Sequence, residues 1–433
     1  MCEWKYQTIG MSDSDDTDGS AGEWPVTKEW LEELLMVYHG EGSQVSVDDF
    51  TVRPGCAAGD SVLSDILAVS VEYRSKPENS RCELSVIVKL LPQDPFSRFF
   101  VTEAQFDLRE IKFYTQVVPE LEAFQKRQLS GGNSGASELP DLPIPACVHA
   151  HYSPAGGSEE SPEPPESFLV LENLRPRGFE GAEFSRGLTL RQAEAALTAV
   201  ARLHALSLAI KVKEGRSLSE RYTFLFQTAR ATDSYQQLVE RGLPQLARFL
   251  ERRPGLEAVL AALLALRPRT KEIIAALLAP EGPLALITHT DFWCNNLLFR
   301  DTEEGVCECA ILDWQMVTYS RPTNDVALLL VSSVPTELRR RHTESLLDRY
   351  WDVLNSNCSS LGLDIQKDLE YNREDLSRDY RRSLLLALLL CIGSVDVALG
   401  DPLTEQRLID VLEDLHNDGI LSGESIELTT SVQ

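Results

Sequence analysis

The sequence predicts an α+β fold with two lobes, a strand-rich lobe followed by a larger and mainly helical one. Between residues 45 and 91, apolar residues alternate or form short runs that Gly, Pro, Asn and Ser interrupt, which is typical of strands. From 188 to 282, and again from about 324, apolar residues recur at helical spacing. Two lobes of this kind favour a ligand bound between them.

Composition narrows the class of protein. The chain has 433 residues and a formal net charge of −26, which opposes binding to a nucleic-acid backbone. Its nine cysteines are scattered without disulfide-scaffold or zinc-site spacing, so we expect reduced thiols and a cytoplasmic location. The N-terminus lacks a signal-peptide pattern. The strongest apolar run, Leu384–Ile392, is too short to span a membrane, which takes about 20 residues.

The order of elements gives the expected domain organisation. Residues 1–22 are acidic and poor in apolar side chains, so we expect a disordered tail. An N-terminal lobe over 23–172 begins with a helix at 26–38 and contains a second helix at 102–118, ended by Pro119. Polar segments at 130–141 and 153–167 are predicted surface insertions. A helical C-terminal lobe follows over 173–425.

The densest chemical signal lies between two short apolar runs, 286–288 and 297–299. The loop between them holds Asp291 and, five residues later, Asn296. Phosphoryl transfer needs a carboxylate to hold the acceptor hydroxyl and oxygen ligands to hold Mg²⁺, and the catalytic loop of protein kinases spaces its Asp and Asn in this way. Asp313, after a predicted strand at 309–312, is the expected second metal ligand. The pattern therefore predicts Asp291 as the base and Asn296 and Asp313 as metal ligands.

Three elements upstream occur in the order that this chemistry needs. Lys89 lies within an apolar strand and would hold ATP phosphates, and Glu110, 21 residues later on a predicted helix, would pair with it. The Gly- and Ser-containing turn at 55–64, with Ser61, could place backbone N–H groups over phosphates. Taken alone, each feature also has a purely structural explanation. Asp and Asn residues often cap turns, Lys89 could lie on an edge strand, Glu110 could face solvent, and the turn at 55–64 could be an ordinary hairpin turn. The order of the set favours a nucleotide site.

The chain resembles the ecdysteroid kinase-like family, also called CHK kinase-like, which is related to choline kinase and aminoglycoside phosphotransferases within the protein-kinase-like fold. The resemblance covers about residues 24–421. It is carried by these pieces: Ile87-Val-Lys89, Phe106-x-x-x-Glu110-Ile-x-Phe-Tyr, Leu169-Val-Leu-Glu172-Asn-Leu, Leu203-His204-Ala-Leu-Ser, His289-x-Asp291-x-Trp293-x-Asn295-Asn296, Ile311-Leu-Asp313-Trp-Gln315 and Pro322-x-x-Asp325.

The resemblance implies further roles for residues of this chain. Glu172, Asn173 and Leu174 would form the hinge that contacts adenine, and Asp325 would anchor the catalytic loop. Two positions depart from the family pattern, which usually has Gly where this chain has Thr290 and Phe where it has Trp314. Neither change removes a chemical group, so activity is expected to persist.

Several functions stay open at this stage. The favoured one is a kinase that uses ATP and Mg²⁺ on the hydroxyl of a small molecule, by resemblance an ecdysteroid or another lipophilic metabolite. A choline- or aminoglycoside-type kinase with a cationic acceptor is one alternative, which the acidic composition would suit. The other is a catalytically silent scaffold, but such a relative should have lost Lys89, Asp291, Asn296 or Asp313, and all four are present. The acceptor pocket is expected around 188–240 and 380–400.

Overall fold

A computed structural model describes residues 26–40, 43–56, 63–76, 80–130, 141–158 and 161–422. The predicted acidic tail at 1–22, Ser61 and most of the first insertion lie outside these residues. The chain forms two compact units, one made of 1–53 and 69–84 and the other of 54–68 and 85–433. The predicted boundary at 172 and 173 stays a prediction.

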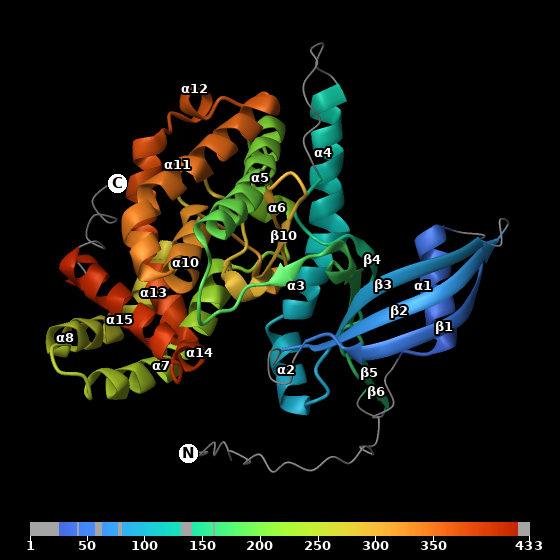
Figure 1. Cartoon of the computed structure of the whole chain (residues 1–433), viewed down its shortest axis with the longest axis horizontal. Coiled ribbons are helices and arrows are strands. Elements are labelled where there is room, and N and C mark those ends of the chain that lie inside the picture. The colour runs from blue at the N-terminus through green and yellow to red at the C-terminus, as the bar shows by residue number, and fades with distance from the viewer. Residues whose placement is uncertain are drawn as a thin grey trace. The chain divides into compact units, whose positions relative to one another are not determined.

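The smaller unit begins with the predicted helix, which is α1, Lys28–His39 (Figure 1, blue). The side chain of Thr27 caps it by accepting a hydrogen bond from the Trp30 backbone N–H at 3.2 Å. Leu31, Leu34 and Leu35 are buried on one face, as expected for apolar residues three and four positions apart.

The predicted strands form one sheet with the order β1-β2-β3-β7-β4. Its strands are β1 (Gln44–Pro54), β2 (Asp65–Lys76), β3 (Ser80–Leu90), β4 (Cys147–His151) and β7 (Phe168–Glu172). β7 runs antiparallel to β3, with Lys89 opposite Leu169 and Val86 opposite Glu172. The pairing places Lys89 and the end of β7 near opposite ends of their shared ladder.

The helical segment after β3 differs from the prediction. It consists of α2 (Pro95–Glu103), α3 (Phe106–Lys112), a π-helical turn (Phe113–Val117) and α4 (Val118–Ser130). The expected helix over 102–118 is thus broken near Gln105, which has a left-handed φ of 57°. The expected end at Pro119 is wrong, because Pro119 lies in the first turn of α4, where the missing N–H is tolerated.

The second predicted insertion contains a small hairpin, β5 (Gly156–Ser158) and β6 (Ser161–Glu163), in which Gly156 lies opposite Glu163. The sequence indicated only a polar surface segment here, since strands of three residues are too short for a period-2 pattern to stand out. Residues 159 and 160, at its tip, lie outside the described part of the chain.

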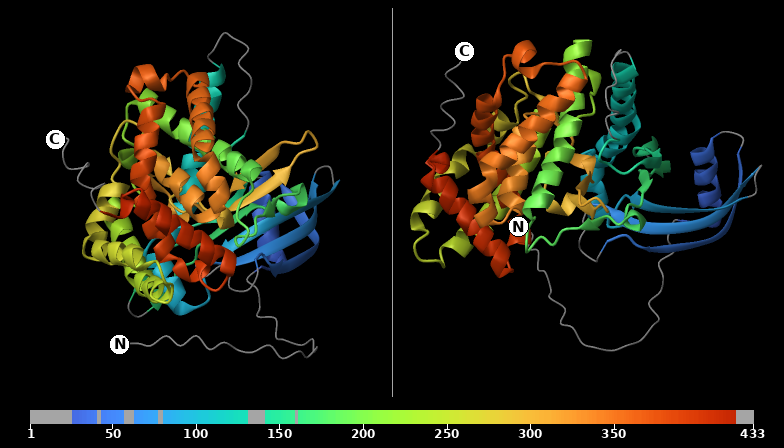
Figure 2. Two further views of the ribbon diagram at one scale, coloured as in Figure 1. Left: turned by 60° about the vertical axis from the view of Figure 1, so that its left-hand side comes forward. Right: turned by 45° about the horizontal axis from the view of Figure 1, so that its top comes forward.

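The remainder is mainly helical, as predicted, and the α+β fold class is confirmed (Figures 1 and 2). The helices are α5 (Leu190–Glu214), α6 (Leu218–Arg221), α7 (Thr228–Leu250), α8 (Glu257–Leu266), α9 (Thr270–Leu278), α10 (Thr323–Ser333), α11 (Thr336–Ser360), α12 (Ile365–Leu369), α13 (Arg373–Gly393), α14 (Val395–Ala398) and α15 (Pro402–Asn417). Five short strands lie among them: β8 (Glu180–Gly181), β9 (Leu286–Thr288), β10 (Leu297–Asp301), β11 (Cys307–Ile311) and β12 (Thr318–Ser320).

Helix α5 forms the centre of this helical part and packs against α11, β9 and β11. Among the described helices, it is the one whose length and apolar composition would suffice to cross a membrane. Because 72% of its apolar stretch is buried inside the protein, burial in the core accounts for that composition.

Two small antiparallel sheets bring the predicted catalytic segments together. β9 pairs with β12, with Thr288 opposite Thr318, and β10 pairs with β11, with Leu297 opposite Ile311. The loop between β9 and β10 and the segment between β11 and β12 therefore leave their sheets side by side.

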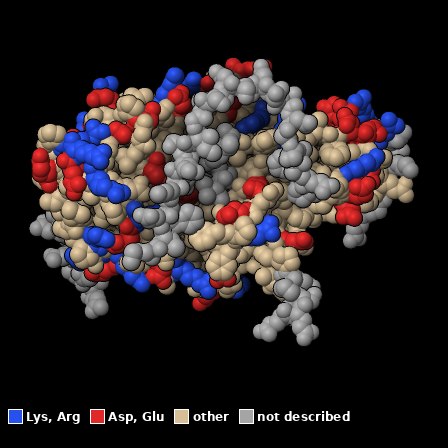
Figure 3. Space-filling model, turned by 90° about the horizontal axis from the view of Figure 1, so that it is seen from below, with Lys and Arg blue, Asp and Glu red and all other residues tan. Residues whose placement is uncertain are grey.

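The face drawn in Figure 3 shows how charge is distributed over part of the surface. Lys and Arg side chains are interspersed there with Asp and Glu side chains among the described residues. The excess of acidic residues in the composition therefore does not gather into one uniform region on this face.

Candidate functional site

The loop between β9 and β10 is held in place by the carboxylate of Asp325, which is fully buried at the start of α10. Asp325 accepts hydrogen bonds from the backbone N–H groups of His289 and Thr290, each at 2.7 Å. Nε2 of His204, on α5, donates to it at 3.1 Å, and Nδ1 of His204 is 2.8 Å from the Tyr350 hydroxyl. The anchoring contact that the resemblance implied is therefore present.

Thr290, the first departure from the family pattern, has a left-handed backbone with φ of 66°. Glycine adopts this conformation freely, whereas an L-residue pays about 1–2 kcal/mol for it. The hydrogen bond to Asp325 and a longer one from the Tyr235 hydroxyl to the Thr290 carbonyl, at 3.5 Å, hold the strained residue. The substitution is thus accommodated with the backbone geometry that Gly would have.

Asp291 and Asn296 lie against each other, as their spacing predicted. Nδ2 of Asn296 donates to Oδ2 and to the backbone carbonyl of Asp291, both at 2.9 Å. These bonds engage the amide nitrogen and orient the amide oxygen, which is the atom that could bind a metal. Burial raises the pKa of Asp291, while nearby His289 acts in the opposite direction. A raised pKa is common in carboxylates that accept protons in a reaction.

His289 links this loop to the segment that carries Asp313. Its Nδ1 accepts from the Asp291 backbone N–H at 3.2 Å, and its Nε2 donates to the Leu312 carbonyl at 2.8 Å. The Leu312 N–H donates to the Asn296 carbonyl at 2.9 Å. Side chain and backbone therefore fix Asp313 relative to Asp291.

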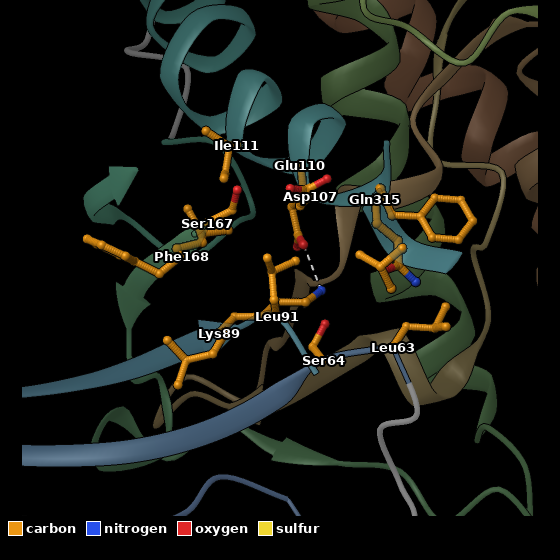
Figure 4. A pocket seen from close by; sticks show the side chains of 14 residues that line it. Leu63, Ser64, Lys89, Leu91, Asp107, Glu110, Ile111, Ser167, Phe168 and Gln315 are labelled. Carbon is orange, nitrogen blue, oxygen red and sulfur yellow. Dashed lines mark ion pairs between the residues drawn. The ribbon is translucent and has the colours of Figure 1, made fainter. Parts of the chain in front are cut away.

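Lys89 lies between two carboxylates, Glu110 and Asp313. Its Nζ is 2.6 Å from Glu110 and 2.8 Å from Asp313, and the pair with Glu110 is drawn in Figure 4. Burial acts to lower the pKa of Lys89, but the two carboxylates outweigh it and raise the pKa, so the lysine stays charged. The contact joins the strand-rich segment to residues that lie more than 200 positions later in the chain.

Glu110 makes a second contact, with the backbone that follows Asp313. One of its oxygens accepts from the Trp314 N–H at 3.2 Å. The indole of Trp314, the second departure from the family pattern, is fully buried and stacks on Phe113 with ring centres 4.1 Å apart. Trp314 thus fills the core beneath the site and leaves the polar groups of Asp313 and Glu110 in contact with Lys89.

The donor set suits a small, hard cation. The Asp313 carboxylate and the Asn296 amide oxygen are the oxygen ligands that Mg²⁺ prefers, and Mg²⁺ is usually bound by one or two carboxylates together with substrate phosphates. Within the part of the chain that the structure describes, no three His, Cys, Asp or Glu side chains form a metal-holding cluster. One carboxylate and one amide oxygen would leave the remaining ligand positions of such a cation to phosphate oxygens or water.

The predicted hinge residues lie at the end of β7. The Glu172 N–H donates to the Ala146 carbonyl at 2.8 Å, and the Asn173 N–H donates to the Ser85 carbonyl at 3.0 Å. Nδ2 of Asn173 also donates to the Ser85 hydroxyl, and Leu174 is buried. Two of the three hinge N–H groups are thus already paired within the protein, and contact with adenine stays a prediction.

The predicted phosphate loop is described only at its ends. The Gly55 N–H donates to the Ile66 carbonyl at 2.7 Å, and a Cβ at Gly55 would come within 2.6 Å of the Ile66 side chain. Arg175 donates to the Gly55 carbonyl at 3.2 Å, a contact that the sequence did not indicate. Ser61 lies outside the described residues, so its role stays a prediction.

A small cavity of about 30 Å³ adjoins the Lys89–Glu110 pair (Figure 4). Its walls come from β3, β7, α2 and α3, and they include Leu91, Phe106 and Phe168 with the half-buried carboxylate of Asp107. The lining residues lie outside the segments 188–240 and 380–400 that were expected to form the acceptor pocket.

The chain is similar to several known proteins. A Caenorhabditis elegans protein named uncharacterized oxidoreductase dhs-27 is 19% identical over 402 residues, 86% of this chain, and the chain spans 43% of the length of that relative. An ethanolamine kinase from Plasmodium vivax is 11% identical with a TM-score of 0.42, covering 84% of this chain and 82% of its own. A choline kinase from Cryptosporidium parvum Iowa II is 12% identical with a TM-score of 0.41. That match covers 86% of this chain and 91% of the choline kinase.

These identities and TM-scores are low, so the assignment rests on the family comparison. The sequence model of the ecdysteroid kinase-like family matches residues 58–363, which is more than half of the chain. The matched segment contains Lys89, Glu110, Asp291, Asn296 and Asp313. This chain therefore belongs to the ecdysteroid kinase-like family.

Proposed function

We propose that this protein transfers the terminal phosphoryl group of Mg·ATP to a hydroxyl group of a small molecule. The observation that carries the proposal is the position of Lys89, 2.8 Å from Asp313, in a site where Asp291 and Asn296 are also joined. Membership of a kinase family supports the same reaction class. A silent scaffold would not need to retain this set of charged groups in mutual contact.

Each residue of the site would have a different role in the reaction. Lys89 would hold the phosphates, and Glu110 would fix the direction of its ammonium group. Asp313 and Asn296 would hold Mg²⁺, which when bound supplies positive charge against the phosphate oxygens. The acceptor oxygen attacks the terminal phosphorus, its proton passes to the Asp291 carboxylate, and the bond to the bridging oxygen breaks to release ADP.

The acceptor is proposed to be a neutral, lipophilic alcohol of the ecdysteroid type, on the strength of the family alone. A cationic alcohol such as choline or an aminoglycoside is the second candidate. We also propose a cytoplasmic location, because the cysteines show no disulfide-scaffold spacing in the sequence and none of the eight described ones forms a disulfide. ATP consumption against hydroxylated steroids, choline and aminoglycosides discriminates between the acceptors.

Nucleotide binding tests the proposal directly. We expect ATP to bind, and to bind more tightly with Mg²⁺, because Asp313 and Asn296 present oxygen ligands beside Lys89. Isothermal titration calorimetry with and without Mg²⁺ measures both effects. Absence of ATP binding both with and without Mg²⁺ would contradict the proposal that this protein is a kinase.

Replacing Lys89 by methionine is expected to weaken Mg·ATP binding about 10- to 100-fold, because hydrogen bonds to charged groups contribute roughly 1.5–3 kcal/mol. Lys271→Met provides a matched control, since Lys271 is largely exposed and forms a surface ion pair with Asp233. Calorimetry on both variants measures the difference. Equal ATP affinity in the two variants would rule out a phosphate-binding role for Lys89.

A further inference from the structure

Arg109, the residue before Glu110 on α3, is a buried cation that the proposed reaction does not use. Its exposed fraction is 2%, and its Nε donates to the Gln315 carbonyl at 2.9 Å. Its guanidinium carbon lies 3.9 Å from the ring centre of Phe226 and 5.0 Å from that of Phe106. Within the described residues, Arg109 forms no ion pair, and its Nη2 has no hydrogen-bond partner.

Stability alone does not account for an arginine at this position. No ion pair with a described residue compensates the buried charge of Arg109, although the Asp107 carboxylate is near enough to attract it. An apolar side chain of similar length would avoid the loss of solvation. Contacts with two aromatic faces offset part of that loss. Burial also lowers the pKa of Arg109, to about 9. A charge kept under these conditions indicates a requirement other than folding.

The Arg109 hydrogen bond is made to the segment that follows Asp313. Glu110 accepts from the Trp314 N–H, and Arg109 donates to the carbonyl of the next residue, Gln315. Arg109 and Glu110, which are adjacent on α3, therefore bind two adjacent residues of this segment. Arg109 donates its hydrogen bond, and Glu110 accepts one. Glu110 is shared with Lys89, whereas Arg109 holds the Gln315 carbonyl and, in the described part of the chain, makes no polar bond to the lysine, so its bond acts on this segment independently of Lys89.

Arg109 is also connected to the loop that carries Asp291. Its guanidinium lies over Phe226, whose N–H donates to the Val317 carbonyl at 3.1 Å. The ring centres of Phe226 and Tyr235 are 6.4 Å apart, and the Tyr235 hydroxyl donates a hydrogen bond to the Thr290 carbonyl. Packed side chains therefore run from α3 to both functional loops.

We propose that Arg109 is a positioning residue that docks α3 onto the Asp313 segment, so that Glu110 and Asp313 both reach Lys89. This inference rests on the proposed function for its effect on nucleotide binding. It assigns Arg109 no contact with the reacting atoms. Its effect reaches the reaction through two neighbours. Glu110 is the next residue after Arg109, and Asp313 lies two residues before Gln315, whose carbonyl Arg109 holds.

Arg109→Met tests the inference, because it removes the hydrogen bond and the buried charge while keeping an apolar stem. We expect the unfolding midpoint to stay the same or rise, and the KM for Mg·ATP to increase about tenfold with a smaller change in kcat. Arg109→Lys keeps the charge and can donate to the Gln315 carbonyl, so it should restore part of the affinity. A lower unfolding midpoint with unchanged KM would reduce Arg109 to a structural residue and overturn the proposal.

Arg339→Met is the matched control. Arg339 is also a buried arginine, but it pairs with Asp414 at 2.7 Å and lies on α11. Its loss should lower the unfolding midpoint, because Asp414 loses a charged partner, and leave the KM of the folded protein unchanged. Arg109→Met should therefore raise the KM for Mg·ATP without lowering the unfolding midpoint, and Arg339→Met should lower the unfolding midpoint without changing the KM.

Amide hydrogen exchange without nucleotide separates this inference from the proposed function. In Arg109→Met, exchange in the segment 312–317 should accelerate about tenfold relative to wild type, while exchange in α5 stays unchanged. If wild type bound no Mg·ATP, the proposed function would fail, and exchange alone would decide the role of Arg109. Unchanged exchange in 312–317 would overturn the docking role.

Discussion

Replacing Asp291 by asparagine is expected to lower turnover by about 10²- to 10⁴-fold and to leave the affinity for Mg·ATP nearly unchanged. Asparagine keeps the size of the side chain, and its amide oxygen can still accept the Asn296 hydrogen bond, which is 2.9 Å long in the wild type. It cannot accept the proton of the acceptor hydroxyl. Steady-state turnover and calorimetric ATP affinity, measured on the same preparation, test both halves of the expectation.

Replacing Asp313 by asparagine should instead weaken Mg·ATP binding itself, by about 100-fold. The change removes a charged metal ligand and one of the two carboxylates that contact Lys89. The comparison is informative because Asp291 and Asp313 belong to one site but have different contacts: Asp291 is joined to Asn296, and Asp313 is joined to Lys89.

Asp348→Asn is a suitable control for both variants, because Asp348 is largely exposed on α11 and pairs with Arg373. It should change neither turnover nor affinity. If Asp291→Asn abolished nucleotide binding and Asp313→Asn spared it, the two roles would have to be exchanged.

Local patterns in the sequence were enough to predict the elements that carry the site. Lys89 stood in an apolar strand and Glu110 on an amphipathic helix, and the structure places their side chains 2.6 Å apart. Asp291 and Asn296 were close in sequence, so their contact followed from a short loop between two strands. In each case the signal was a periodic element or a short spacing, which is what sequence patterns report well.

Contacts between distant segments could not be predicted in the same way. The hydrogen bond between Lys89 and Asp313 joins residues 224 positions apart, and the one between His204 and Asp325 joins residues 121 apart. The sequence around each of these residues gives no indication of its distant partner. Arg109 looked like an ordinary polar residue of α3, and only the packing of Phe226 and Gln315 around it reveals that it is buried.

Backbone irregularities were the other features that the sequence did not indicate. The pattern suggested one helix ended by Pro119, but the π-helical turn Phe113–Val117 changes the phase of the helix before the proline. The left-handed conformations of Thr290 and Asp313 were equally hidden, because each is imposed by the partners of the surrounding loop. Such conformations depend on tertiary contacts that a single sequence does not specify.

Asp325 should be the most sensitive residue of the site outside the reacting groups. Its carboxylate is the shared acceptor for His289 N–H, Thr290 N–H and His204 Nε2, and all of these groups are buried. Alanine at this position leaves three buried donors without an acceptor. We expect a loss of roughly 3–5 kcal/mol in the free energy of unfolding, the range found when one partner of a buried ionic contact is removed.

The same change should also lower turnover in the protein that stays folded, because Thr290 would lose the bond that holds its strained backbone next to Asp291. Asp325→Asn should give an intermediate loss, since asparagine keeps one acceptor oxygen but directs an N–H₂ group at another donor. Denaturant unfolding and turnover below the melting range measure the two effects separately, with Asp348→Ala as the surface control. A stability of Asp325→Ala within about 1 kcal/mol of wild type would show that the loop is held by its strands and by His289 instead.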